Sequence, residues 1–162
     1  MNYTGISPNT AGELQKNWTK FHEENKANPD LKYLQFCHSQ GAIHTRNALG
    51  SCSEEIRNRV IVVAIAPAAI VPDELCYRSF NYASKKDIVH YGELLHAGAL
   101  DTSEVGVSKN LARILENREQ LILLDPHPDA TGIDHEFESL TFREIIRDHI
   151  EVHLKQCKEI SP

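Results

Sequence analysis

The apolar run VIVVAIA, at residues 60–66, constrains the fold more than any other segment of the chain. Most of its residues are β-branched, none of them alternates with a polar residue, and Pro67 ends the run. Uninterrupted apolar strands are typical of parallel sheets, because helices cover both faces of such sheets. The run therefore predicts a central strand of a parallel sheet.

Segments with strand or helix patterns lie on both sides of this run. We expect further strands at 31–37, 78–83 and 121–124, and helices at 10–25, 41–49, 54–57, 107–119 and 142–155. In the last helix an inward stripe is expected from Phe142, Ile145, Ile146, Ile150 and Leu154. Residues 67–77 leave room only for a short helix or a 3₁₀ turn, since a crossover usually takes about a dozen residues or more. This alternation predicts an α/β fold with a mostly parallel sheet and flanking helices.

Length and charge limit the classes of protein that this chain can belong to. We expect one domain over residues 1–162, with residues 1–10 as a flexible lead. The net charge is -6 and no basic cluster is present, which argues against tight binding to nucleic acid. No apolar run approaches the roughly 20 residues of a membrane-spanning helix.

The cysteines and the N-terminus predict a cytoplasmic protein. No two cysteines have the C-x-x-C spacing of a zinc or redox motif, so we expect reduced thiols at Cys37, Cys52, Cys76 and Cys157. The first residues lack the basic and apolar regions of a cleaved secretion signal. A non-cleaved export signal of another kind stays open as an alternative.

A serine stands at the turn between the strand expected at 31–37 and the helix that follows. In the segment CHSQG, this position predicts a nucleophile elbow that exposes the hydroxyl of Ser39. The usual pattern is Gly-x-Ser-x-Gly; here Cys37 holds the first position, and Gly41 would let the helix pack close to the strand. His38 is expected to pack against or support the site. An ordinary helix-capping serine is the alternative.

An acid and a histidine follow two later strands, in the order Ser, Asp, His along the chain. Asp87 lies in SKKDIV after the strand at 78–83, and His135 lies in GIDHEF between the last strand and the last helix. Because the carboxyl ends of parallel strands meet at one edge of a sheet, we expect both side chains to lie near Ser39.

The three motifs together resemble the C-terminal half of an α/β-hydrolase of the lipase or esterase type, over about residues 31–155. In that fold the acid lies in a D-x-V loop that is often followed by proline, where this chain has His90. The histidine commonly precedes a Ser-x-x-Phe/Tyr sequence that leads into the last helix, here residues 139–142. The whole chain also resembles an uncharacterised chlamydial protein family.

The hydrolase resemblance implies acyl transfer without a cofactor. It assigns the nucleophile to Ser39, the general base to His135 and the orienting carboxylate to Asp87. A histidine near its working pKa can take the hydroxyl proton and return it to the leaving group, while the carboxylate fixes its tautomer. The backbone N–H of Gln40 would be one oxyanion donor. The expected function is hydrolysis of a small-molecule or lipid ester.

Several other residues compete for these roles. His127 is an alternative base, but we favour His135 because it immediately precedes the closing helix. Asp125 or Asp129 could replace Asp87 as the acid.

A metal site is a further alternative, since the loop after the last strand holds His127, Asp129, Asp134 and His135. No known ligand spacing is present there, so we predict no metal. His149 and His153 stand four residues apart without the glutamate of the metalloprotease pattern, and we predict that both are surface residues.

Part of a complete hydrolase fold is missing from this sequence. Only the lead and one helix precede residue 31, so no early strand is available to supply the second oxyanion donor. The strand at 31–37 would also become an exposed apolar edge. The chain is therefore expected to be a fragment, a protein that pairs this edge with another subunit or segment, or an inactive remnant. A non-catalytic α/β binding or assembly module is the alternative function.

Overall fold

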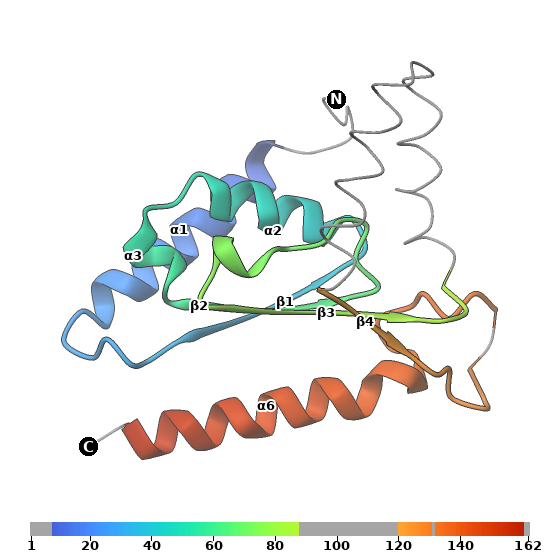
Figure 1. The fold of residues 1–162 in the computed structure, drawn as a ribbon. Helices are drawn as coiled ribbons and strands as arrows, with labels where there is room; N and C mark the ends of the chain where they lie inside the picture. Colours follow the sequence, from blue (N-terminus) through green and yellow to red (C-terminus); the bar gives the residue numbers. More distant parts are fainter. Residues whose placement is uncertain (1–7, 88–119, 131, 161–162) are drawn as a thin grey trace.

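The structure is a computed structural model, and it describes residues 8–87, 120–130 and 132–160. At its centre lies a sheet of four parallel strands in the order β1-β2-β3-β4 (Figure 1). Helices α1, α2 and α3 cover one face of this sheet, and α6 lies along the other (Figure 1). The expected α/β fold with a parallel sheet and flanking helices is confirmed.

The described elements are α1 (Pro8–Glu24), β1 (Tyr33–His38), α2 (Gly41–Gly50), α3 (Glu54–Arg57), β2 (Val60–Ile65), the 3₁₀ helix η1 (Asp73–Leu75), β3 (Arg78–Ser84), β4 (Leu121–Leu124) and α6 (Leu140–Ile160). β1 begins two residues later than expected, because the N–H of Leu31 still bonds to the carbonyl of Asn28 in the preceding turn. α6 continues past Lys155, since the lysine, glutamine and glutamate that follow are good helix formers. The helix expected at 107–119 lies outside the described residues.

The connection between β2 and β3 contains only a short 3₁₀ helix, as its length predicts. It contains η1, and β2 and β3 pair in parallel. The fully buried Asn81 of β3 accepts a hydrogen bond from the N–H of Val71 and donates one to its carbonyl, each at 3.0 Å. A side chain thereby satisfies backbone groups that a crossover without a regular helix would leave unpaired in the core.

β2 supplies both cores, because its side chains alternate between the two faces of the sheet. Val62 packs with Trp18 of α1 in the core beneath α1 and α2. Val63 packs with Phe142 of α6 in the core on the opposite face. All four of these side chains are at most 1% exposed, which explains why the central strand carries no polar alternation.

The expected inward stripe of α6 is correct only near its start. Phe142 is buried and Ile146 packs against the same core, but Ile150 and Leu154 are 39% and 53% exposed. Residues four apart are offset by about 40° on a helix of 3.6 residues per turn. Three such steps from Phe142 therefore turn Leu154 away from the sheet.

β1 is an outer strand of the described sheet and pairs only with β2 there. Its residues are half-buried except for Cys37, which is buried. Because all strands are parallel, the segments after β1, β2, β3 and β4 emerge at one edge. None of the helices in the described ranges is both long enough and apolar enough to cross a membrane.

Candidate active site

The structure brings the predicted serine, histidine and aspartate together at the carboxyl edge of the sheet. The Oγ of Ser39 lies 2.9 Å from Nε2 of His135, and Nδ1 of His135 lies 2.9 Å from Oδ2 of Asp87. The Asp87 side chain is fully buried, and that of His135 is 17% exposed. A carboxylate only accepts hydrogen bonds, so Nδ1 of His135 carries the proton and donates a hydrogen bond to Asp87. Nε2 is then free of a proton and accepts the hydrogen bond that the hydroxyl of Ser39 donates.

Ser39 has the backbone conformation of a sharp strand-to-helix turn. Its φ of 48° lies in the left-handed region, which a non-glycine residue seldom adopts unless its surroundings enforce it. The N–H of Ser39 bonds to the carbonyl of Ile65, and its carbonyl accepts hydrogen bonds from Ala42 and Ala68. The end of β2 and the first turn of α2 thus hold the elbow in place.

The helix-capping alternative for Ser39 is wrong. The N-cap residue of α2 is Gln40, whose side chain makes no capping hydrogen bond. The hydroxyl of Ser39 is hydrogen-bonded to Nε2 of His135 instead. The N–H of Gln40 therefore belongs to the N-terminus of α2, where backbone dipoles favour negative charge.

Cysteine replaces the first glycine of the elbow pattern without a clash. A Cβ added at Gly41 would lie 3.7 Å from the Cβ of Cys37, which is an ordinary van der Waals distance. The start of α2 thus lies close to β1 at Gly41, and a Cβ at this position would fit as well. Cys37 itself is buried between the sheet and α2.

Burial makes this cysteine a poor nucleophile and leads to a testable difference among the thiols. It raises the pKa of Cys37 and of Cys76 to about 12. Thiol reagents attack the thiolate. At pH 8 we expect Ellman's reagent to modify Cys52 and Cys157, which are only half-buried, long before Cys37 and Cys76. Peptide mapping after native and denatured alkylation checks this order, and rapid native modification of Cys37 would contradict it.

His38 ties the serine turn to the histidine loop. Its Nε2 donates a hydrogen bond to the backbone carbonyl of His135 at 2.7 Å. Its ring lies 5.0 Å from the His135 ring and 6.1 Å from that of Phe137, measured between centroids. The expected supporting role of His38 thus corresponds to a direct contact with the loop that carries His135.

Asp134 is a second buried acid in the loop that carries His135. Its carboxylate accepts hydrogen bonds from the hydroxyls of Ser139 and Thr141, and its backbone is left-handed with a φ of 53°. Desolvation raises the pKa of Asp134, but hydrogen bonds from Ser139, Ser84 and Thr141 and the charge of Lys86 outweigh it, so that the pKa is lowered overall. The sequence pattern assigns Asp134 no such role; the signals it offers are an aspartate directly before His135 and two hydroxyl residues, Ser139 and Thr141, around the start of the last helix.

The competing residues have other partners. His127 accepts a hydrogen bond at Nδ1 from the N–H of Asp129, and its side chain is 42% exposed. Asp125 pairs with Lys85 at 2.7 Å and is 86% exposed, while the Asp129 side chain is 82% exposed. None of the three is hydrogen-bonded to His135 in the described structure, so Asp87 is the acid that contacts His135.

The metal alternative finds no geometric support. Two of the four residues considered as metal ligands have other partners: His135 contacts Ser39 and Asp87, and the carboxylate of Asp134 accepts a hydrogen bond from the hydroxyl of Thr141. The described ranges contain no group of three histidine, cysteine or acidic side chains arranged to hold a metal ion.

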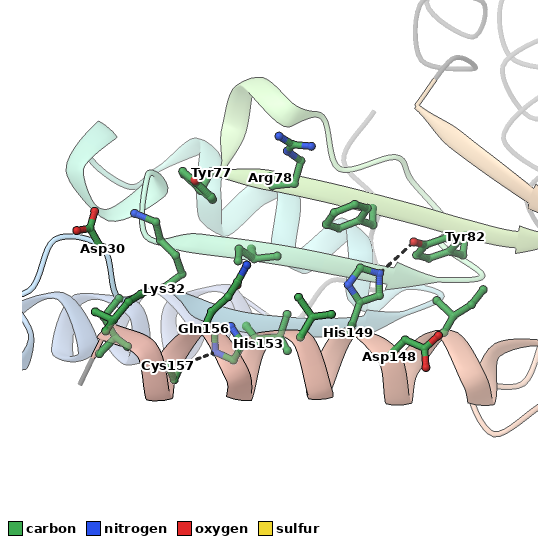
Figure 2. A pocket seen from close by; sticks show the side chains of 17 residues that line it. Asp30, Lys32, Tyr77, Arg78, Tyr82, Asp148, His149, His153, Gln156 and Cys157 are labelled. Carbon is green, nitrogen blue, oxygen red and sulfur yellow. Dashed lines mark hydrogen bonds between the residues drawn. The ribbon is translucent and has the colours of Figure 1, made fainter. Parts of the chain in front are cut away.

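The prediction that His149 and His153 are surface residues is wrong. Both are half-buried, and both face a hollow between α6 and the sheet rather than open solvent (Figure 2). Polar residues four apart on an amphipathic helix usually lie on its solvent face. Here the helix turns this face toward the sheet.

Comparisons of the chain with protein-family models, with curated proteins and with solved structures found no match. Any assignment of activity therefore depends on the geometry and chemistry of the site itself.

Proposed function

We propose that the chain is a serine hydrolase that transfers the acyl group of an ester to water. The observation that carries this proposal is the unbroken hydrogen-bond chain from Ser39 through His135 to the buried Asp87, with both links at 2.9 Å. Hydroxyl, imidazole and carboxylate in this order are the parts needed for nucleophilic acyl transfer. The left-handed turn at Ser39 supports the same function, because backbone strain concentrates at functional sites.

The reaction would begin with the attack of Ser39 Oγ on the ester carbonyl carbon. Nε2 of His135 takes the hydroxyl proton as the C–O bond forms, and the carbonyl becomes a tetrahedral oxyanion. Collapse of this intermediate expels the alcohol, which receives the proton from His135. Water then attacks the acylated Ser39 with His135 again as the base, and the acid product leaves as the serine is reprotonated.

The start of α2 is the proposed oxyanion site. The N–H of Gln40 follows the nucleophile directly, and the dipole of α2 favours a developing negative charge at this position. We assign no second donor among the described residues. One missing donor typically costs about 10²–10³ in kcat, so we expect slow turnover of activated esters.

A fluorophosphonate probe tests the proposal directly, because it forms a covalent bond only with an activated serine. We expect the intact protein to be labelled and to hydrolyse p-nitrophenyl butyrate, and we expect Ser39→Ala to lose both activities. Ser53→Ala is the matched control, since Ser53 is exposed and makes no side-chain capping bond. Circular dichroism should show that both variants keep the native helix content.

Two results would contradict the proposal: the folded protein is not labelled, or Ser39→Ala is labelled as strongly as the unchanged chain. Either outcome would favour the alternative of a non-catalytic α/β binding or assembly module.

A further inference from the structure

A cavity of about 730 Å³ lies between the sheet and α6, apart from the triad (Figure 2). β1, β2 and β3 form one wall and α6 forms the other. Ser39, Asp87 and His135 do not line it. Its volume falls in the range of roughly 300–1,000 Å³ that is typical of small-molecule sites.

The walls are largely apolar. From the sheet, the lining includes Leu34, Ile61 and Phe80, and from α6 it includes Ile145 and Val152. Val152 is 56% exposed although it faces this hollow. Side chains from the sheet and from α6 thus surround a space that stays accessible. Covering apolar surface of this kind with a ligand is favourable, because it removes that surface from water.

Uncharged hydrogen-bonding groups converge on the same space from α6 and β3. Tyr82 and His149 share a hydrogen bond of 3.0 Å between Oη and Nε2. One turn further along α6, Nε2 of His153 lies 3.6 Å from Sγ of Cys157. Figure 2 shows these groups projecting between the helix and the sheet, with the side chain of Gln156 among them. A few such groups in an apolar site fix the orientation of a ligand.

The cavity disfavours charge on the groups that line it. Desolvation lowers the pKa of His149 and of His153, and it raises the pKa of Tyr82. All three shifts favour the neutral form. Lys32 also has a lowered pKa, caused first by desolvation and then by the charge of Arg59, and its ammonium group lies 4.4 Å from the ring centroid of Tyr77.

The remaining charges give no preference for an ion. Asp30, Lys32, Arg78 and Asp148 are the four formally charged side chains of the lining, and two are acidic and two basic. Their formal charges cancel, so neither an anion nor a cation is favoured by the net charge of the cavity.

We propose that this cavity binds a neutral single-chain amphiphile, such as a fatty alcohol, with its alkyl chain between the sheet and α6 and its polar group at the Tyr82–His149 pair. The two walls belong to one chain, and the volume matches a small molecule. The proposal is independent of the proposed hydrolase activity, because no residue of the triad lines the cavity.

Binding can be measured with N-phenyl-1-naphthylamine, an uncharged apolar fluorophore. We expect saturable fluorescence enhancement that 1-dodecanol reverses at about tenfold lower concentration than dodecanoate or dodecyltrimethylammonium, all below their aggregation concentrations, because an apolar site penalises a buried charge. Equal displacement by the charged and uncharged chains would overturn the proposal. Absence of saturable enhancement would overturn it as well.

α6 provides a matched pair of variants. Val152 lines the cavity and Leu154 does not, yet the two are 56% and 53% exposed on the same helix. We expect Val152→Glu to weaken probe binding about tenfold or more and Leu154→Glu to leave it unchanged. Equal loss in both variants would overturn the assignment.

Two further measurements separate this cavity from the triad and from a contact between two copies of the chain. Ser39→Ala should bind the probe as the unchanged chain does, so failure of the hydrolase proposal leaves this one standing. Light scattering reports the oligomeric state at the same concentrations. If enhancement occurs only in a dimer and disappears on dilution, this hollow is a contact between two copies and the proposal is wrong.

Discussion

Replacing Asp87 by asparagine is expected to lower kcat for ester hydrolysis about 10⁴-fold. The carboxylate of Asp87 lies 2.9 Å from Nδ1 of His135, where it holds the proton on that nitrogen. An asparagine amide can instead donate an N–H to Nδ1, which selects the opposite tautomer. Nε2 then carries a proton and cannot accept the one from Ser39, so the nucleophile is no longer activated.

The measurement is steady-state hydrolysis of p-nitrophenyl butyrate, with kcat and KM determined separately. We expect the loss in kcat, because substrate binding does not involve the buried side chain of Asp87. Asp125→Asn is the matched control: this acid follows β4 at the same edge but is 86% exposed and pairs with Lys85, so kcat should change less than about twofold. A loss of less than about tenfold in folded Asp87→Asn would show that Asp87 does not orient the base.

The proximity of Ser39, Asp87 and His135 can be predicted from the sequence because it follows from the order of the strands. The uninterrupted apolar run at 60–66 indicates a parallel sheet, and parallel strands place all their following loops at one edge. Ser39, Asp87 and His135 each stand in such a loop, so their proximity follows from topology without knowledge of side-chain contacts. The hydrogen bonds of 2.9 Å are consistent with that expectation.

The contacts that hold the loop around His135 could not be predicted in the same way. The bond from His38 to the carbonyl of His135 joins residues 97 positions apart, and it depends on the path of a loop that has no periodic pattern. The left-handed φ of Asp134 belongs to the same loop and was not indicated by any motif, whereas the sharp turn at Ser39 was indicated by the segment CHSQG. Loop geometry is set by tertiary packing, which a single sequence does not display.

The rotation of α6 about its own axis could not be predicted from the sequence either. The sequence predicts an inward stripe of Phe142, Ile145, Ile146, Ile150 and Leu154 along the whole helix, whereas Ile150 and Leu154 are exposed. His149 instead lines the cavity between α6 and the sheet. An amphipathic pattern identifies a helix reliably, but polar and apolar residues share the α6 face that lines the cavity. The rotation of the helix therefore had to come from the structure.

Replacing Asp134 by alanine is expected to affect both stability and catalysis. The carboxylate accepts hydrogen bonds from Ser139 and Thr141, and its removal leaves these hydroxyls without their partner. Alanine also tolerates the left-handed φ of 53° less well than aspartate or asparagine does. We expect the free energy of unfolding to fall by about 2–3 kcal/mol, from the lost charge-assisted hydrogen bonds and the added backbone strain.

The effect on catalysis follows from the position of Asp134 directly before His135. When the turn relaxes, the imidazole is held less firmly against Ser39, and small misplacements of catalytic groups cost about 10²-fold in rate. We expect kcat to fall by about 10–100-fold in Asp134→Ala with KM little changed. Asp134→Asn should recover part of this loss, because asparagine accepts one hydrogen bond and adopts the same backbone conformation. Asp129→Ala, an exposed acid of the same loop, should behave as the unchanged chain.

The pH dependence of stability shows whether the charge of Asp134, and not only its packing, holds the loop in place. The pKa of Asp134 is lower in the folded chain than in the unfolded one, so its stabilising contribution is fully present above about pH 4 and is lost as the pH falls through the folded pKa. The difference in melting temperature between the unchanged chain and Asp134→Ala should therefore be largest at neutral pH and shrink toward about pH 3. A difference that stays constant over this range would mean that the charge of Asp134 does not hold the loop.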